Sequence, residues 1–224
     1  MSGKNRIGWL VGVLAAAAFA GPVHAATIYL EDFTGQVGKG AIGPGGANPT
    51  VDLEGVDWTL DLAVDMTASS DFIQVRLVGS NEMLVVQDPG GPASWVSPVI
   101  NISGLSDVEI SIYIDAASAN YNEDEHEVQF QYILDGGAPV TFFNADDLWG
   151  PVAADNDGFP KGTFSSDILP AGNSLQVVIF TDTRSGVHAF RFDDIQVTGV
   201  PEPASAALLM MGVAPMMLRR RRQA

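Results

Sequence analysis

Apolar and polar residues alternate with a period of two along much of the chain, as expected for strands that bury one face. The clearest example is 107–115, where Val108, Ile110, Ile112 and Ile114 alternate with polar residues. No long stretch has the 3.6-residue period of an amphipathic helix. The pattern therefore predicts a half-buried strand here and a chain that is built mainly of strands.

The same alternation continues further along the chain, where it is interrupted by a turn sequence. Asp135-Gly136-Gly137 consists of residues that tolerate the positive φ of a tight turn. We therefore predict a hairpin between 127–134 and 139–143. Apolar residues on both faces of 173–181 predict a central strand. Weaker strands are predicted at 28–33, 58–64, 72–78, 83–87, 95–100 and 189–197.

Short strands at this spacing, separated by Gly- and Pro-rich turns, are typical of an all-β antiparallel β-sandwich. Two connections are longer than strands require: a glycine-rich one at 35–49, expected to be a mobile surface loop, and an acidic one at 144–162. Sugar rings stack on exposed aromatic side chains, so Trp149 in the acidic connection is the candidate ligand-binding residue. Trp58 and Trp95 lie in apolar patterns and are expected in the core.

The N-terminal end has the pattern of an export signal. A basic start is followed by the apolar stretch 7–19, the helix breaker Gly21-Pro22 and the small residues before Ala25. The apolar stretch is shorter than the ~20 residues that span a bilayer. We therefore predict a cleaved signal peptide at 1–25, with an uncleaved anchor as the alternative.

The C-terminal end reverses this order. Pro201-Glu202-Pro203 precedes a short apolar helix at 204–218 and the basic run Arg219–Arg222. Arginines beside an apolar segment stay on the cytoplasmic side of a membrane, which leaves the main domain outside. The sequence therefore divides into 1–25, a sandwich domain at 26–199 and a terminal signal at 200–224.

The charge of the central region limits the possible partners. Residues 26–200 contain five basic and 26 acidic residues, a formal charge of −21. Nucleic acid and anionic lipid would be repelled, which leaves cations as natural partners and solubility as the alternative reason for the acidity. The chain has no cysteine, so disulfides, thiolate nucleophiles and cysteine zinc sites are excluded.

Motifs for catalysis are incomplete, and we predict no catalytic residues. His126-Glu127 lacks the second histidine of a zinc protease, because Phe130 occupies that position. The only other histidine after residue 25 is His188, and no nucleophile motif accompanies either histidine. A carboxylate pair for glycoside hydrolysis stays open as the enzymatic alternative, since its spacing is set in three dimensions.

Two acidic pairs predict a calcium site between the first and last strands. Phe190 and Phe192 set one phase of the last strand, whereas Ile195 continues on the other phase, so a β-bulge is expected at Asp193-Asp194. First and last strands of sandwiches are often neighbours, so the calcium ligands predicted are Glu31, Asp32, Asp193 and Asp194. The alternative is that these acids occupy exposed strand ends. A second, weaker candidate is the turn containing Asp155 and Asp157.

The C-terminal tail, Val200 to Ser205 followed by the apolar run and the arginines, resembles the PEP-CTERM sorting signal. In that family an exosortase, a membrane-embedded protease of Gram-negative bacteria that make exopolysaccharide, recognises the motif matched here by Pro201, Glu202 and Pro203. The resemblance implies export, transient anchoring in the inner membrane and retention at the cell surface or in an extracellular matrix.

The body is similar to secreted jelly-roll modules of laminin-G-like or carbohydrate-binding-like type. The similarity lies in 95–104, 132–137 and 192–197, which match a strand entry, a hairpin turn and a closing strand. Several such modules hold a structural calcium where the first and last strands meet. The resemblance implies a non-enzymatic, calcium-stabilised carbohydrate-binding or adhesive module with extracellular polysaccharide as a partner. A secreted hydrolase and a purely structural matrix protein are the alternatives.

Overall fold

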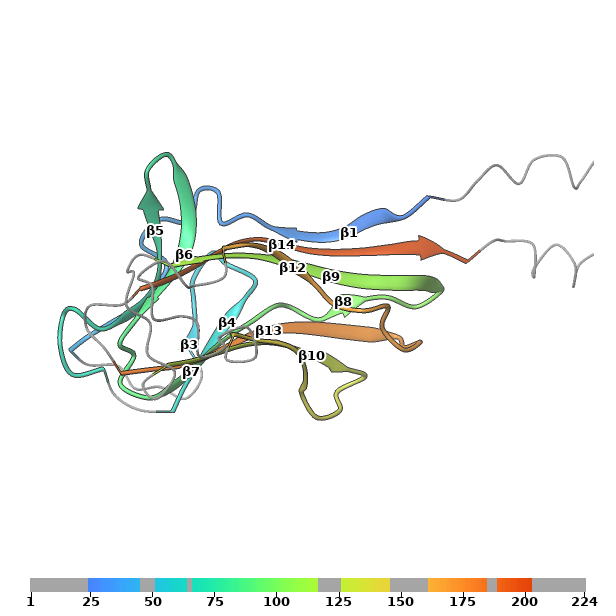
Figure 1. Cartoon of the computed structure of the whole chain (residues 1–224). Coiled ribbons are helices and arrows are strands. Elements are labelled where there is room, and N and C mark those ends of the chain that lie inside the picture. The colour runs from blue at the N-terminus through green and yellow to red at the C-terminus, as the bar shows by residue number, and fades with distance from the viewer. Residues whose placement is uncertain are drawn as a thin grey trace, which may run out of the picture.

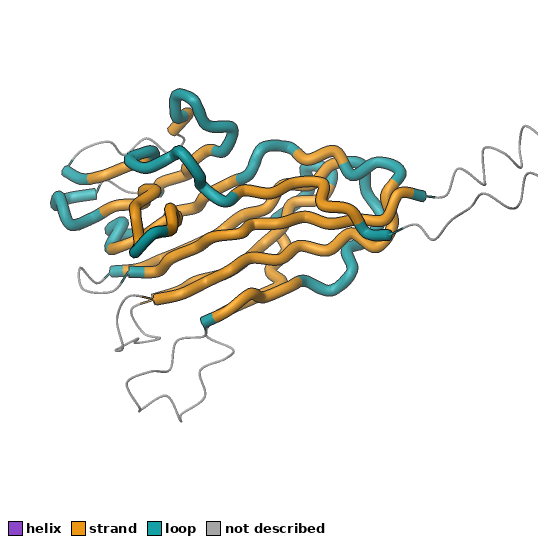
Figure 2. Tube along the Cα trace, turned by 90° about the horizontal axis from the view of Figure 1, so that it is seen from above, coloured by secondary structure: helices purple, strands orange, loops and turns teal. Residues whose placement is uncertain are grey.

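The structure is a computed structural model that describes residues 24–44, 51–63, 66–116, 126–145, 161–184 and 189–202. Strands and loops make up these residues, and they contain no α-helix (Figure 2). The strands are β1 (Ala26–Glu31), β2 (Gly40–Ile42), β3 (Val51–Asp52), β4 (Thr59–Leu62), β5 (Phe72–Val78), β6 (Asn81–Gln87), β7 (Pro92–Val96), β8 (Ile100–Asn101), β9 (Leu105–Ala116), β10 (His126–Leu134), β11 (Val140–Asn144), β12 (Gly162–Ser165), β13 (Ser174–Thr183) and β14 (Phe190–Pro201).

Two antiparallel sheets form the molecule (Figure 1). The first has the order β12-β9-β14-β6-β5-β2, with β1 also paired to β14. The second has the order β11-β10-β13-β7-β4-β3, with β8 also paired to β13. The prediction of an all-β antiparallel sandwich is confirmed.

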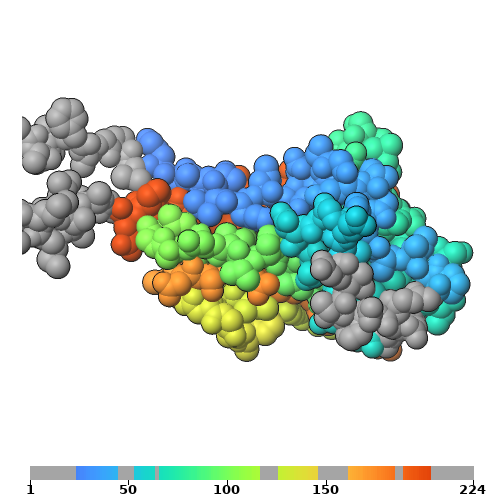
Figure 3. Space-filling model, turned by 180° about the vertical axis from the view of Figure 1, so that it is seen from behind, coloured from blue at the N-terminus to red at the C-terminus, as the bar shows by residue number. Residues whose placement is uncertain are grey.

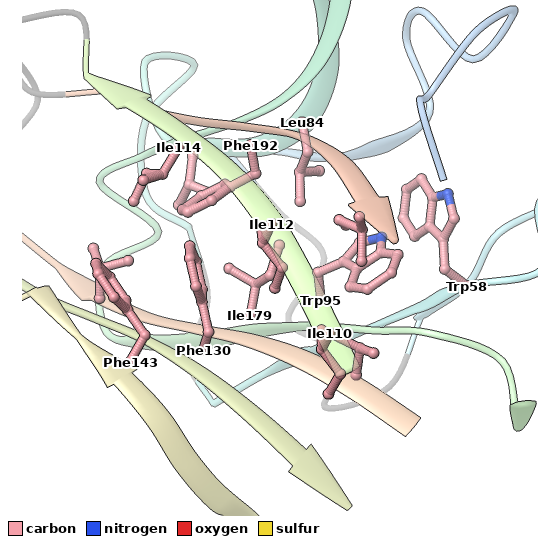
Figure 4. Close-up of a cluster of buried hydrophobic side chains, with 14 of the residues drawn as sticks. Trp58, Leu84, Trp95, Ile110, Ile112, Ile114, Phe130, Phe143, Ile179 and Phe192 are labelled. Carbon is pink, nitrogen blue, oxygen red and sulfur yellow. The ribbon is translucent and has the colours of Figure 1, made fainter. Parts of the chain in front are cut away.

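The core lies between the inner faces of the two sheets (Figure 4). The alternation predicted for 107–115 is confirmed, because Val108, Ile110, Ile112 and Ile114 are buried while Glu109 is exposed. The predicted burial of Trp58 and Trp95 is also confirmed, since both side chains are 0% exposed. Their rings lie 6.3 Å apart and each meets Phe33 edge-on.

The β10–β11 hairpin has the turn that the sequence predicted. Asp135 and Gly136 have φ values of 50° and 68°, and the Gly137 N–H donates to the Leu134 carbonyl at 2.9 Å. Asp135 Oδ1 also accepts the N–H groups of 173 and 174 at 2.8 and 2.9 Å, which ties the turn to the start of β13. The turn residues therefore set the hairpin and also connect it to the neighbouring strand.

The prediction of a mobile surface loop at 35–49 is wrong for its central part. Residues Gly40–Ile42 form β2, which pairs with β5. A Cβ at Gly40, where φ is 124°, would lie 2.3 Å from the Ile73 carbonyl oxygen. Only glycine allows this close approach of two backbones, so the residue that suggested a loop is required by a strand pair. Residues 45–50 lie outside the described residues.

The single strand predicted at 95–100 is also wrong. The chain leaves β7 at Val96 and resumes pairing in β8 at Ile100, because Pro98 has no N–H to donate to a ladder. Ser97 bridges the gap: its hydroxyl accepts the Val177 N–H at 2.8 Å. The short strands β3 and β12 were not predicted, since two to four residues give no measurable period.

Strand register defines two ends of the sandwich. Ala26 pairs with Gly199 and Leu105 with Pro201, so the described chain starts and finishes at one end (Figure 1). Strands β9, β10, β13 and β14 meet at the opposite end, where Ala116 pairs with Phe190 and His126 pairs with Thr183. We call these the terminal end and the loop end.

The predicted signal peptide and apolar C-terminal helix fall on residues 1–23 and 203–224, outside the described residues. Among the described residues, no helix has the length and hydrophobicity to cross a membrane. The sorting motif begins inside the fold: Pro201 ends β14, and the Glu202 N–H donates to the Gly104 carbonyl at 2.9 Å.

Candidate functional site

The structure brings the two predicted acidic pairs to the same part of the first sheet. β1 runs antiparallel to β14, with Glu31 opposite Ile195. Asp32 directly follows β1, and its charge raises the pKa of Asp193, which places the two carboxylates within electrostatic range. The expected proximity of the first and last strands is therefore confirmed.

The β-bulge predicted at Asp193-Asp194 is present. The register of β14 against β9 shifts between Asp193 and Gln196, and Asp194 has a φ of 48°. Phe192 and Ile195 are both fully buried, which requires the extra residue between them. Asp193 Oδ1 accepts the Asp194 N–H at 2.9 Å and so closes the bulge.

The carboxyl group of Asp193 is electrostatically perturbed. Partial burial raises its pKa from the usual 3.8 to about 6, and the charges of Asp194 and Asp32 act in the same direction. The hydrogen bond from the Asp194 N–H lowers the pKa but does not offset these effects. Burial and the neighbouring negative charges therefore make the ionised form of Asp193 less favourable than it is in water.

Glu31 has a structural role that the sequence did not predict. Its Oε1 accepts the Phe33 N–H at 2.8 Å and the Gln36 Nε2–H at 2.9 Å. Gln36 Oε1 in turn accepts the Trp58 indole N–H at 2.7 Å. Glu31 thus holds the turn after β1 against the core, and burial raises its pKa.

These carboxylates do not form an assembled metal cage. No group of three or more His, Asp or Glu side chains in the described ranges is close enough to hold one ion. The structure therefore supports proximity of Asp32 to Asp193 but no coordination geometry. The second calcium candidate lies outside the described residues, since it consists of Asp155 and Asp157. The same is true of the predicted ligand-binding residue, Trp149.

The His126-Glu127 dipeptide lies at the start of β10, as predicted from the alternation. His126 is buried, and its ring meets Phe190 edge-on with centroids 5.6 Å apart. A strand places successive side chains on opposite faces, whereas the zinc-protease motif needs a helix. His188 lies outside the described residues.

Sequence reasoning missed a groove on the side of the sandwich. It has a volume of about 350 Å³ and lies between the β10–β11 hairpin and the segment that follows β12. These two segments lie side by side on the surface (Figure 3). Tyr132 and Phe142 supply aromatic rings, while Val140 and Ile168 are 45% and 63% exposed. The remaining lining residues are Thr141, Ser165, Ser166, Asp167 and Leu169.

A weak signal for this groove exists in the sequence. Ile168 is a large apolar residue outside any strand, and Tyr132 is an aromatic residue near the end of an alternating strand. Neither observation locates a groove, because the two walls are more than twenty residues apart and meet only when edge strands of different sheets approach each other.

Comparisons with known proteins return distant structural similarities. The adhesin domain K3 of Lys-gingipain from Porphyromonas gingivalis has a TM-score of 0.44 and 13% identity, covering 78% of this chain and 99% of that chain. TmCBM61, solved with β-1,4-galactotriose, has a TM-score of 0.38 and 10% identity, covering 74% and 92%. A family 30 carbohydrate-binding module from Clostridium thermocellum has a TM-score of 0.34 and 11% identity, covering 78% and 97%.

At these identities and TM-scores, none of the three similarities carries an argument about the ligand of this chain. No protein-family model matches the sequence. No curated protein matches it either.

Proposed function

We propose that this chain is an exported, non-enzymatic module that acts by binding carbohydrate or by another form of adhesion. It is retained at the cell surface or in an exopolysaccharide matrix. The observation that carries the proposal is that β1 starts and β14 finishes at the same end of the sandwich, the terminal end (Figure 1). An export segment before Ala26 and a sorting segment after Pro201 would leave from this end. The groove and the loop end would stay accessible to extracellular partners.

The sequence of the tail supports the same proposal. Its resemblance to a PEP-CTERM signal favours processing by an exosortase, with membrane contact only before cleavage. The short apolar run suits transient insertion better than permanent anchorage. Glu202 is held by a backbone hydrogen bond at the edge of the sandwich, so the protease would act close to the folded domain.

The experiment is expression of the full chain in a Gram-negative host that contains an exosortase. We expect the protein in the surface or matrix fraction, with an intact mass that lacks residues 1–25 and Arg219–Arg222, and binding to a glycan microarray. A matched Glu202→Ala variant should accumulate unprocessed in the membrane fraction. Recovery of Arg219–Arg222 peptides from most of the surface population would contradict processing.

The outcome on glycans distinguishes the competing functions. Binding without cleavage supports the adhesive module, and turnover of the bound oligosaccharides supports a hydrolase with a carboxylate pair. Surface retention without any glycan binding supports a purely structural matrix protein. All three outcomes are measured on the same purified protein, so differences in expression or folding cannot explain which outcome is observed.

Calcium stabilisation through Asp32, Asp193 and Asp194, with Glu31 nearby, is a further part of the proposal. What supports it is the raised pKa of Asp193, about 6, to which burial contributes most and the repulsion from Asp194 and Asp32 contributes further. A divalent cation would relieve this repulsion as protonation does. Because the described residues hold no assembled cage, water or further oxygen ligands would have to complete the coordination.

The pH dependence of stability tests the raised pKa of Asp193 directly. The folded-state pKa of Asp193 is raised, so the folded protein binds the proton more tightly than the unfolded chain does. Stability should therefore rise as the pH falls from about 7 through 6 toward 4. The full shift corresponds to about 3 kcal/mol, which solvent screening of this half-exposed group reduces to about 1 kcal/mol.

Asp193→Asn should raise stability at pH 7 by that reduced amount and flatten the profile between pH 4 and 7, measured by urea unfolding. In the wild-type protein at pH 7, calcium should raise the melting temperature above the value in sodium at matched ionic strength. Asp193→Asn should lose this difference. An equal effect of sodium, or a full calcium effect in the variant, would show that calcium does not bind here.

A further inference from the structure

We propose that the groove between the β10–β11 hairpin and the segment after β12 binds an uncharged saccharide, with Tyr132 and Phe142 as its aromatic walls. This inference rests on the proposed carbohydrate-binding function and gives that function a site and a ligand class. The site is distinct from the carboxylates at the β1–β14 edge. Its volume of about 350 Å³ lies at the low end of the range for small-ligand pockets.

The two aromatic rings provide the apolar surface that a sugar ring requires. The centroids of Tyr132 and Phe142 lie 6.5 Å apart with an interplanar angle of 34°. Both side chains are only partly buried, and both pack against the core on their inner sides. Phe142 is also 6.0 Å from Phe130, which is fully buried. The rings are therefore held in place by the core while each leaves part of its surface toward the groove.

Polar groups in the groove are available for hydrogen bonds to sugar hydroxyls. Within the part of the chain that the structure describes, the side-chain oxygens of Tyr132, Ser165 and Asp167 have no hydrogen-bond or ion-pair partner. Ser166 Oγ accepts the Ile110 N–H at 3.0 Å, which orients a buried hydroxyl that keeps its own proton for donation. Aromatic walls with a few convergent polar groups are typical of a small-molecule site.

Charge selects the class of saccharide. Asp167 is the only ionisable acid among the lining residues, and no basic residue lines the groove. The surrounding region 26–200 has a formal charge of −21. A uronic acid or a sulfated sugar would meet this negative potential without a cation to pair with it. A neutral sugar avoids the repulsion, and its hydroxyls can donate to the Asp167 carboxylate.

Two exposed apolar residues at the rim of the groove favour a ligand that would cover them. Val140 and Ile168 are on opposite walls of the groove, and they are 45% and 63% exposed. Exposed apolar residues that gather at one concave site favour a binding role. The less polar face of a pyranose ring can cover such a rim while its hydroxyl edge reaches Ser165 and Asp167.

The experiment measures binding of the exported protein, recovered from the same host, to a microarray of neutral and uronate-containing glycans. Affinities for the best neutral glycan are then determined by calorimetry. Tyr132→Ala should weaken binding by at least about tenfold, which is the loss expected for an aromatic anchor. Asp167→Ala changes an exposed side chain without affecting the core and should weaken binding severalfold.

Two controls separate the site from the function. Tyr113→Ala alters a half-buried tyrosine on the outer face of the first sheet and should leave the affinity unchanged. Tyr132→Phe keeps the ring and should retain most of the binding. If the wild-type protein binds no glycan, the proposed carbohydrate-binding function fails. If it binds but Tyr132→Ala and Asp167→Ala bind equally well, or if only uronate-containing glycans bind, the groove assignment is wrong.

Discussion

Phe130→Ala is expected to lower the free energy of unfolding by about 3–5 kcal/mol, a large part of the 5–15 kcal/mol typical of a folded domain. Phe130 is fully buried between the two sheets (Figure 4). Its ring stacks on Phe143 with centroids 4.6 Å apart and meets Phe192 of the opposite sheet edge-on at 6.0 Å. Removal of the ring leaves a cavity at the contact of the sheets.

Urea unfolding followed by tryptophan fluorescence measures this loss, and Phe164→Ala is the matched control. Phe164 is only partly buried and lies in the edge strand β12, where its ring contacts Phe143 at 4.5 Å. Its removal should cost about 1–2 kcal/mol, because less apolar surface is returned to water. Equal losses for the two variants would contradict the position of Phe130 at the centre of the core.

Asp71→Ala is expected to cost about 2–4 kcal/mol, because two backbone N–H groups would lose a charged acceptor whose side chain is buried. Asp71 is only 4% exposed and precedes β5. Its Oδ2 accepts the N–H groups of Thr67 and Ala68 at 2.9 and 2.7 Å, and its Oδ1 accepts the Ser70 hydroxyl at 3.0 Å. One carboxylate therefore closes the connection between β4 and β5.

Asn101→Ala is the matched control for Asp71→Ala. Asn101 Oδ1 also accepts a backbone N–H and a hydroxyl, both from Ser103, but on the exposed surface. Water can replace these bonds, so the expected loss is below about 1 kcal/mol. A loss in Asn101→Ala as large as that in Asp71→Ala would mean that burial does not decide the cost.

The pH dependence of Asp71 has the opposite sign to that of Asp193. Burial alone would raise the pKa of Asp71, but the hydrogen bonds from Ala68, Ser70 and Thr67 outweigh it and hold the pKa below its usual 3.8. Its contribution is therefore present above the unfolded-state value and is lost as the pH falls through the folded-state pKa. Asp71→Ala should remove this acid-side loss and leave the Asp193 effect at higher pH intact.

Features carried by a few adjacent residues were determined by the sequence alone. The alternation of 107–115 placed its strand and its buried face, because side chains of a strand point to opposite sides in turn. The change of phase between Phe192 and Ile195 located the bulge, since two buried residues of opposite phase need an extra residue between them. Asp135-Gly136 specified its turn through the left-handed φ values it tolerates.

Features that depend on contacts between distant segments were decided only by the tertiary structure. From the sequence, Gly40 indicated a loop. In the structure it lies in a strand paired with β5, where the close approach of the two backbones leaves no room for a Cβ. Glu31 was expected to bind a cation, yet the turn at Phe33 and Gln36 occupies one of its oxygens. The groove of Tyr132 and Asp167 arises from two edge strands of different sheets, and no local pattern encodes that contact. Local backbone preferences act over neighbouring residues, whereas burial, close approach and pKa depend on the whole packed chain.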